Sequence, residues 1–168
     1  MRTNMNIYLI GMPGSGKTTI GKRLAKTLGY SFVDLDHKIE KDTLMFVDEI
    51  FEQYGEKTFR EFETKALSEL KGCDQLVVST GGGIVTRKEN KQLMEGLVVF
   101  IDTELDIIEK RIVHDFPRPL LKTKTLEALK DERMLKYIFF SDLIVSNDHD
   151  PQKTIDQILK NMKEQSHV

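Results

Sequence analysis

The sequence predicts an α/β fold in which a parallel β-sheet carries helices on both faces, and three observations support this prediction. Short runs rich in valine and isoleucine recur along the chain without a clean alternation of apolar and polar residues, which is typical of strands buried on both faces. Stretches with helical spacing separate these runs, as in successive βαβ units. Glycine and proline fall between the segments, where turns are expected.

The positions of glycine and proline delimit the expected strands and helices. Five strands are expected, at Asn6–Ile10, Ser31–Asp34, Leu76–Ser79, Leu97–Ile101 and Leu143–Val145. Seven helices are expected, at Lys17–Leu28, Val47–Tyr54, Thr58–Lys71, Thr86–Glu95, Glu104–His114, Thr125–Phe140 and Pro151–Met162. Gly29, Gly72 and Gly96 each follow a helical stretch, where a left-handed residue closes a helix before the next strand. Asp150 and Pro151 are expected to be the N-cap and first residue of the last helix.

Length and composition narrow the class of protein. The 168 residues are expected to form one domain over residues 1–168, with a net charge of −2 that argues against a general nucleic-acid binder. The longest apolar run, Leu97–Ile101, is too short to cross a membrane, and the polar start Met1–Asn6 gives no sign of a signal peptide. The single cysteine, Cys73, excludes an internal disulfide framework and a cysteine-built zinc site. We therefore expect a cytoplasmic protein.

A glycine-rich segment follows the first expected strand and opens the first expected helix. It reads Gly11-Met12-Pro13-Gly14-Ser15-Gly16-Lys17-Thr18, which matches the pattern G-x-x-x-x-G-K-[ST]. Backbone N–H groups of such a loop bind phosphate, helped by the positive end of the helix. Lys17 is expected to neutralise the β- and γ-phosphates of a nucleotide, and Thr18 to bind Mg²⁺. The alternative, a glycine turn that matches by chance, is disfavoured by the strand before it and the helix after it.

Two aspartates stand at the end of the second expected strand. Because residues two apart on a strand point the same way, Asp34 and Asp36 can both face the cleft beyond the sheet. One carboxylate can hold the metal through water while the other accepts a hydrogen bond from a substrate hydroxyl. The alternative is a helix N-cap before His37–Lys41.

Two further groups are candidates for the acceptor side. Arg60 and Glu63, three apart on one helix face, form either a functional pair or an ordinary surface ion pair. Three consecutive glycines, Gly81–Gly83, follow the third strand and suggest close approach of the backbone to a ligand, with a loose turn as the alternative.

The segment around Pro117 and Pro119 must interrupt the helical pattern. Phe116 and Arg118 each precede a proline and are pushed away from helical geometry. The functional interpretation is a flap that brings Arg118 onto the transferring phosphate, and the alternative is an ordinary surface loop. Arg133 and Tyr137 stand four apart on the next expected helix and can share a face.

Together these residues resemble the shikimate kinases along nearly the whole chain. The resemblance rests on an ordered set of motifs: the phosphate loop at 11–18, Asp34 and Asp36, Phe59-Arg60 with Glu63, Gly81–Gly83, Arg118–Leu121, and Arg133 with Tyr137. It implies a three-layer P-loop NTPase fold of the nucleoside-monophosphate-kinase type, with a five-stranded parallel sheet in the order 2-3-1-4-5. It also implies a substrate-binding helical region at about 35–62 and a lid at about 112–124.

The same resemblance implies transfer of the ATP γ-phosphate to the 3-hydroxyl of shikimate, with Mg²⁺ as cofactor. Asp36 meets the reacting hydroxyl, Arg60 and Arg133 hold the substrate carboxylate, Glu63 positions Arg60, and the Gly81, Gly82 and Gly83 backbone completes that pocket. The ATP site comprises Gly11 to Thr18 together with Thr19, Arg111 beside the adenine, and Arg118, which also contacts the substrate. Thr18 and Asp34 serve the metal. A monomer acting on small molecules is expected, with no nucleic-acid or membrane partner.

One segment departs from the family pattern. Where the family usually has a glycine and then a serine, this chain has Thr43-Leu44-Met45-Phe46 near the hinge of the substrate-binding helices. Two alternative functions stay open beside the resemblance. One is another small-acceptor kinase, for gluconate or a nucleotide, and the other is a nucleotide-dependent binding module, which predicts a continuous basic surface.

Overall fold

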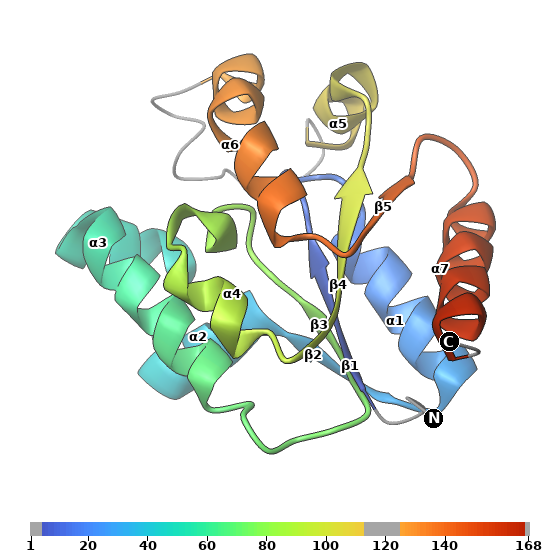
Figure 1. Cartoon of the computed structure of the whole chain (residues 1–168). Coiled ribbons are helices and arrows are strands. Elements are labelled where there is room, and N and C mark those ends of the chain that lie inside the picture. The colour runs from blue at the N-terminus through green and yellow to red at the C-terminus, as the bar shows by residue number, and fades with distance from the viewer. Residues whose placement is uncertain (1–4, 113–124, 167–168) are drawn as a thin grey trace.

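The computed structural model describes residues 5–112 and 125–166 and shows a five-stranded parallel sheet in the order β2-β3-β1-β4-β5 (Figure 1). The strands are β1 (Asn6–Ile10), β2 (Ser31–Asp34), β3 (Leu76–Ser79), β4 (Gly96–Asp102) and β5 (Leu143–Ser146). The strand order and the parallel pairing confirm the predicted sheet. Gly96, expected to close a helix, is instead the first residue of β4 and pairs with Asn6.

The helices are α1 (Lys17–Leu28), α2 (Leu35–Thr43), α3 (Val47–Ser68), α4 (Glu89–Leu93), α5 (Leu105–Ile112), α6 (Leu126–Phe140) and α7 (Pro151–Ser166), with a 3₁₀ turn η1 at Ile84–Thr86. The predicted helix Thr86–Glu95 is present only in part, as α4, because Arg87 is extended between η1 and α4. The predicted break near residue 55 is present, since Gly55 has φ 84° and kinks α3. None of the helices in the described part of the chain is both long and apolar enough to cross a membrane.

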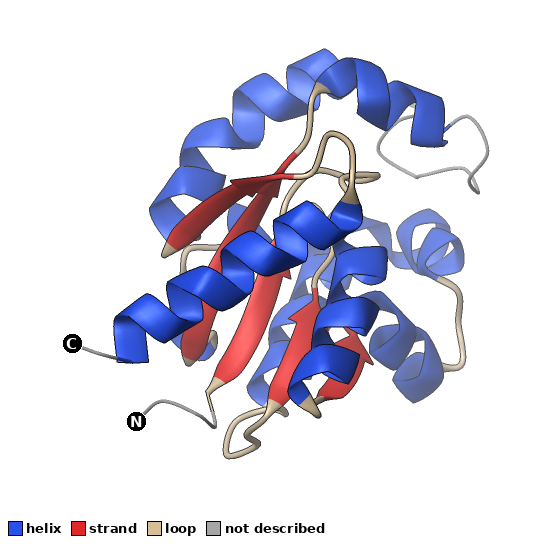
Figure 2. Ribbon diagram, turned by 90° about the vertical axis from the view of Figure 1, so that its right-hand side faces the viewer, coloured by secondary structure: helices blue, strands red, loops and turns tan. Residues whose placement is uncertain are grey.

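Two hydrophobic clusters hold the three layers together. Alternate residues of the central strand β1 point to opposite faces of the sheet. Tyr8 and Ile10 belong to a cluster with α2, α3 and α6, whereas Ile7 and Leu9 belong to one with α1 and α7. Figure 2 shows α7 lying across the second of these faces. The sheet is therefore covered on both sides, as its apolar strands require.

The parallel strands all end at the same edge of the sheet. Figure 1 shows the strand arrows pointing toward the edge above which α5 and α6 lie. In open α/β sheets, ligands bind outside this edge. The phosphate loop follows β1 here, Asp36 follows β2 and the glycine turn follows β3.

Candidate active site

The phosphate loop is built by the end of β1 and the start of α1, as the sequence predicted. Gly16 is the N-cap of α1 with φ 101°, a conformation that favours glycine. The Lys17 ammonium group donates to the carbonyl oxygens of Gly11 (2.6 Å) and Met12 (2.9 Å). The buried Lys17 side chain thus lies against the first two residues of the loop and places its charge beside the N-terminus of α1.

The loop has no room for side chains at two of its glycines. A Cβ atom at Gly11 would lie 2.6 Å from the carbonyl oxygen of Ile101. One at Gly16 would overlap the side-chain amide of Asn147 and lie 3.4 Å from Arg111 Nη1. The Ser15 hydroxyl is fully buried and makes no hydrogen bond to any residue that the structure describes. A phosphate oxygen in the loop would satisfy such a donor.

Two residues that follow β4 and β5, together with Arg111 of α5, support the phosphate loop. Asn147 Nδ2 donates to the Ser15 carbonyl (2.9 Å), and the Thr103 hydroxyl donates to the same carbonyl (3.0 Å). Arg111 donates to the carbonyls of Gly14 (3.2 Å) and Asn147 (3.0 Å). Arg111 therefore lies against the phosphate loop, and its place beside the adenine stays a prediction.

Thr103 and Asn147 were not identified from the sequence as residues of the site, although their positions after two strands could have indicated them. Each is the first polar residue beyond the end of a strand, Thr103 after β4 and Asn147 after β5. The rule that ligands lie at the carboxyl ends of strands applies to these two strands as well as to the first three.

The two aspartates after β2 have different environments. Asp34 is the N-cap of α2, and its Oδ1 accepts a hydrogen bond from the His37 amide (3.2 Å). Asp36 lies within the first turn of α2, so the argument from strand alternation was wrong for it. Asp36 nevertheless reaches the glycine turn, because its Oδ1 would lie 3.1 Å from a Cβ atom at Gly81.

Arg60 and Glu63 form a buried ion pair, so the surface alternative is wrong. The Arg60 Nη1 to Glu63 Oε1 distance is 2.7 Å, and the two residues are 7% and 0% exposed. Arg60 also contacts Glu56 at the surface (3.1 Å), and its guanidinium lies 5.4 Å from the Phe59 ring centroid. These contacts fix the direction in which the guanidinium points.

Burial raises the pKa of Glu63 from 4.5 to about 7, against the attraction of Arg60 and with a smaller contribution from the nearby Asp36 charge. Its Oε2 atom makes no hydrogen bond within the described residues. That oxygen would lie 3.0 Å from a Cβ atom at Gly81. A side chain at Gly81 would therefore meet the carboxylates of both Glu63 and Asp36.

The glycine turn is in close contact with three parts of the site, so the loose-turn alternative is wrong. A Cβ atom at Gly82 would lie 2.8 Å from the Pro13 ring of the phosphate loop and 3.1 Å from Arg133 Nη1. One at Gly83 would overlap the guanidinium of Arg60. The turn thus brings Arg60 and Arg133 together beside the phosphate loop.

Arg133 and Tyr137 reach the turn from α6, where both are buried. The Tyr137 hydroxyl donates to the Gly82 carbonyl at 2.6 Å. Burial raises the pKa of Tyr137 to about 12, while the nearby positive charge of Arg133 opposes the rise. The hydroxyl is therefore protonated at neutral pH and acts as a donor.

The residues suggested for Mg²⁺ fit a metal that is held mainly by nucleotide phosphates. Thr18 is exposed beside Lys17, and the cap bond of Asp34 uses one of its two carboxylate oxygens. Within residues 5–112 and 125–166, no three His, Cys, Asp or Glu side chains gather into a metal cluster. Mg²⁺ commonly needs only one or two protein oxygens besides water and phosphate, so this donor set suits it.

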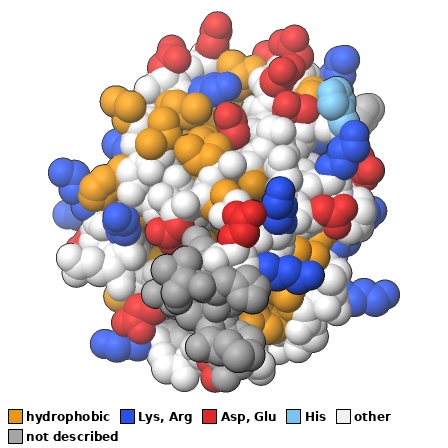
Figure 3. Space-filling model, turned by 45° about the vertical axis from the view of Figure 1, so that its right-hand side comes forward, with side chains coloured by type: hydrophobic (Ala, Val, Ile, Leu, Met, Phe, Trp, Pro, Cys, Tyr) orange, Lys and Arg blue, Asp and Glu red, His pale blue; other side chains and the backbone are white. Residues whose placement is uncertain are grey.

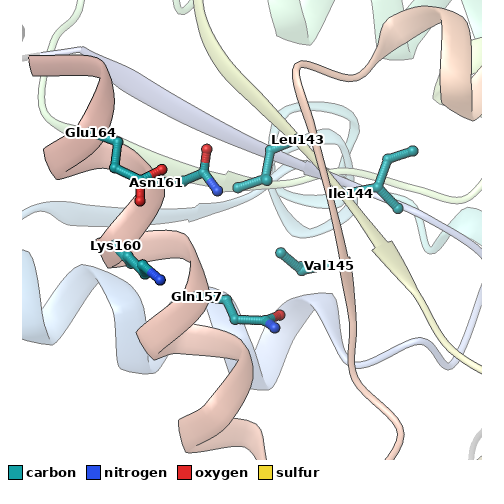
Figure 4. A pocket seen from close by; sticks show the side chains of 7 residues that line it. All are labelled: Leu143, Ile144, Val145, Gln157, Lys160, Asn161 and Glu164. Carbon is teal, nitrogen blue, oxygen red and sulfur yellow. The ribbon is translucent and has the colours of Figure 1, made fainter.

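Two other features complete the description. Arg118 and the predicted lid at about 112–124 lie outside the described residues, apart from Ile112. A separate groove of about 250 Å³ lies between β5 and α7, where Leu143 and Val145 point toward the helix and Ile144 points away (Figure 4). It shares none of the residues predicted to bind nucleotide or acceptor.

Comparison with known proteins shows which family this chain is similar to. A family model described as shikimate kinase matches residues 13–163. The chain is 40% identical over 162 residues to the shikimate kinase of Rippkaea orientalis, covering 93% of this chain and 87% of the relative. It is 43% identical over 163 residues to that of Synechococcus elongatus, covering 93% and 85%.

A solved structure gives the same result in three dimensions. The shikimate kinase from Acinetobacter baumannii in complex with shikimate matches with a TM-score of 0.91 and 34% identity, over 96% of this chain and 94% of that chain. Sequence and structure agree over nearly the full length, and this chain belongs to the shikimate kinase family.

Proposed function

We propose that this chain transfers the γ-phosphate of ATP to the 3-hydroxyl of shikimate, giving shikimate 3-phosphate and ADP. The observation that carries the proposal is the pair of buried arginines, Arg60 and Arg133, that meet at the glycine turn beside the phosphate loop. Planar guanidinium groups suit a carboxylate, and two of them suit one carboxylate better than one does. A relative with shikimate bound and the same fold adds support.

The reaction forms a bond between the shikimate 3-oxygen and the γ-phosphorus and breaks the bond from that phosphorus to the β–γ bridging oxygen. Asp36 accepts the hydrogen of the attacking hydroxyl, either as a base or as an orienting group. Lys17 neutralises charge on the β- and γ-phosphates. The transfer needs mainly alignment of the two substrates and charge neutralisation. The phosphate loop and the glycine turn, which hold the two substrates, therefore contribute most to it.

The nucleotide side completes the proposal. Gly11 to Thr19 bind the phosphates, and Arg111 flanks the adenine. Thr18 and Asp34 hold Mg²⁺, which supplies positive charge to the phosphates when it is bound. Arg118 closes over the phosphates from the lid. One chain is sufficient for this arrangement, so we propose a monomer acting on two small molecules.

Two of the competing functions are less consistent with the site, whereas gluconate also carries a carboxylate and is distinguished by the choice of acceptor in the assay. A nucleoside acceptor has no carboxylate for Arg60 and Arg133 to bind. A module that binds nucleic acid needs a continuous basic surface. On the face shown in Figure 3, Lys and Arg side chains are interspersed with Asp and Glu.

The test is ADP release from MgATP with shikimate, quinate or gluconate as the acceptor. We expect shikimate-dependent turnover, little with the other two, and none in Lys17→Ala, which loses the charge beside the γ-phosphate. Turnover that prefers gluconate or quinate to shikimate would contradict the proposal. Circular dichroism of Lys17→Ala serves to show that the fold is retained.

A further inference from the structure

We propose that Tyr137 is a positioning residue for the acceptor substrate, because its hydroxyl holds the glycine turn against which Arg133 lies. The inference rests on the proposed function and adds a residue that the motifs alone did not assign to a role. Tyr137 does not touch the substrate in this proposal. It acts through two groups that do.

The first group is the backbone of the glycine turn. The 2.6 Å bond from the Tyr137 hydroxyl fixes the direction of the Gly82 carbonyl, and with it the peptide planes of Gly81–Gly83. A run of three glycines has more conformational freedom than other sequences, so it needs such external restraints. The Pro13 ring restrains Gly82 from the phosphate loop. On the far side of the turn, Asn90 Nδ2 donates to the Ile84 carbonyl at 2.8 Å.

The second group is the Arg133 guanidinium. It lies over Gly82, with Nη1 3.1 Å from where a Cβ atom would be. Arg133 and Tyr137 stand four residues apart on α6, and the positive charge of Arg133 acts on the phenol. Tyr137 therefore holds the Gly82 peptide against which the substrate-binding Arg133 guanidinium lies.

The tyrosine ring is fixed well enough to serve this purpose. It is fully buried, and it stacks on Phe100 of β4 with ring centroids 4.9 Å apart. A phenylalanine would fill the same space against Phe100. The hydroxyl is thus the part of the side chain that packing does not explain, and its bond to Gly82 leads to the acceptor pocket.

Tyr137→Phe is the direct test, with Tyr8→Phe as its matched control. Tyr8 is a second buried tyrosine in the same hydrophobic cluster, but its hydroxyl contacts Asn6 at the opposite end of β1. Both variants remove one buried hydroxyl, so a loss of stability common to both is structural. We expect Tyr137→Phe to raise KM for shikimate on the order of tenfold, since it leaves the Gly82 carbonyl without its donor and the glycine turn less restrained. Its kcat and KM for ATP should stay within about threefold, and Tyr8→Phe should change none of these constants.

A double-mutant cycle shows whether Tyr137 acts through Arg133. We expect Tyr137→Phe to have much less effect on KM for shikimate when Arg133 is already alanine, because the interaction it serves is gone. An unchanged KM in Tyr137→Phe, equal changes in both tyrosine variants, or full additivity with Arg133→Ala would each overturn the inference. If the wild-type protein has no shikimate-dependent turnover, the proposed function fails instead, so the two failures are distinguishable.

Discussion

At the scale of single residues, the acceptor pocket depends on glycines without a Cβ atom as much as on charged side chains. Gly83 has φ −98°, which any residue can adopt, so its backbone does not demand glycine. What demands it is the Arg60 guanidinium, which occupies the place of a Cβ atom. The glycine is therefore required by the position of an arginine rather than by the geometry of the turn.

Gly83→Ala is predicted to displace Arg60 without unfolding the protein. The atoms in the way belong to the far end of a flexible side chain, so the guanidinium moves and the backbone stays. We expect KM for shikimate to rise about 10- to 100-fold, as for loss of a charge-assisted hydrogen bond, with a small change in Tm. Gly72→Ala is the control, since φ 87° at Gly72 strains the backbone far from the site. It should lower Tm and leave KM unchanged.

Glu63 is predicted to make stability depend on pH. Its pKa is raised from 4.5 to about 7 by burial, so between these values the folded state binds a proton that the unfolded state releases. The contribution of Glu63 to the free energy of unfolding is fully present below pH 4.5 and is lost as the pH rises through about 7. The difference of 2.5 pKa units corresponds to roughly 3 kcal/mol.

Urea unfolding of the wild type and Glu63→Gln between pH 4 and 8 measures this effect. The glutamine keeps an oxygen for Arg60 but cannot ionise, so we expect the wild type to lose stability relative to the variant as the pH rises. Glu56→Gln removes the exposed carboxylate on the same arginine and should leave the pH dependence in place. Parallel pH profiles for the wild type and Glu63→Gln would mean that Glu63 does not titrate in this range.

At the scale of elements, the joint between α2 and α3 is less well capped than the family pattern. Leu44 closes α2 with φ 58°, the left-handed conformation that favours glycine, and its side chain is 90% exposed. Phe46 is the N-cap of α3 and is 69% exposed. Its side chain cannot accept a hydrogen bond from the helix, so this end is stabilised by the bonds from its own amide to Glu49 Oε1 (3.3 Å) and from the Val47 amide to Glu40 Oε2 (3.1 Å).

Restoring the two family residues is predicted to stabilise the protein. Leu44→Gly relieves a left-handed Cβ, and Phe46→Ser adds an N-cap acceptor, each worth about 1 kcal/mol or about 2–4 °C in Tm. Leu44→Ala is the control, because it removes the exposed side chain but keeps the Cβ atom. If it raises Tm as much as Leu44→Gly does, exposure of leucine and not backbone strain is responsible.

The elements also show which features could be predicted from the sequence. Strand positions and order followed from local apolar runs and from the resemblance, and they are confirmed. The helix predicted over Thr86–Glu95 forms only from Glu89 to Leu93, where Asn90 is bonded to Ile84 and to Thr64 of α3. The burial of Arg60 and Glu63 could not be read from their spacing, since a surface pair has the same spacing.

At the scale of the whole molecule, the acceptor pocket joins parts of the chain that are far apart in sequence. Arg60 comes from α3, the glycine turn follows β3, and Arg133 comes from α6. In a folded protein, these parts meet only because the sheet and its two clusters place them together. A ligand held by all three binds the folded state and not the unfolded one, so it must raise the free energy of unfolding.

Shikimate is therefore predicted to stabilise the wild-type protein and not Arg133→Ala. At a concentration 100 times its Kd, the added stability is about 2.7 kcal/mol, or roughly 5–10 °C in Tm for a domain of this size. Each variant is compared with itself without ligand, so any intrinsic destabilisation by the substitution cancels. Arg111→Ala, which changes the nucleotide side of the site, should retain the full shift with shikimate. An undiminished shift in Arg133→Ala would mean that Arg133 does not hold the acceptor, and the carboxylate would then have to be placed against Arg60 alone.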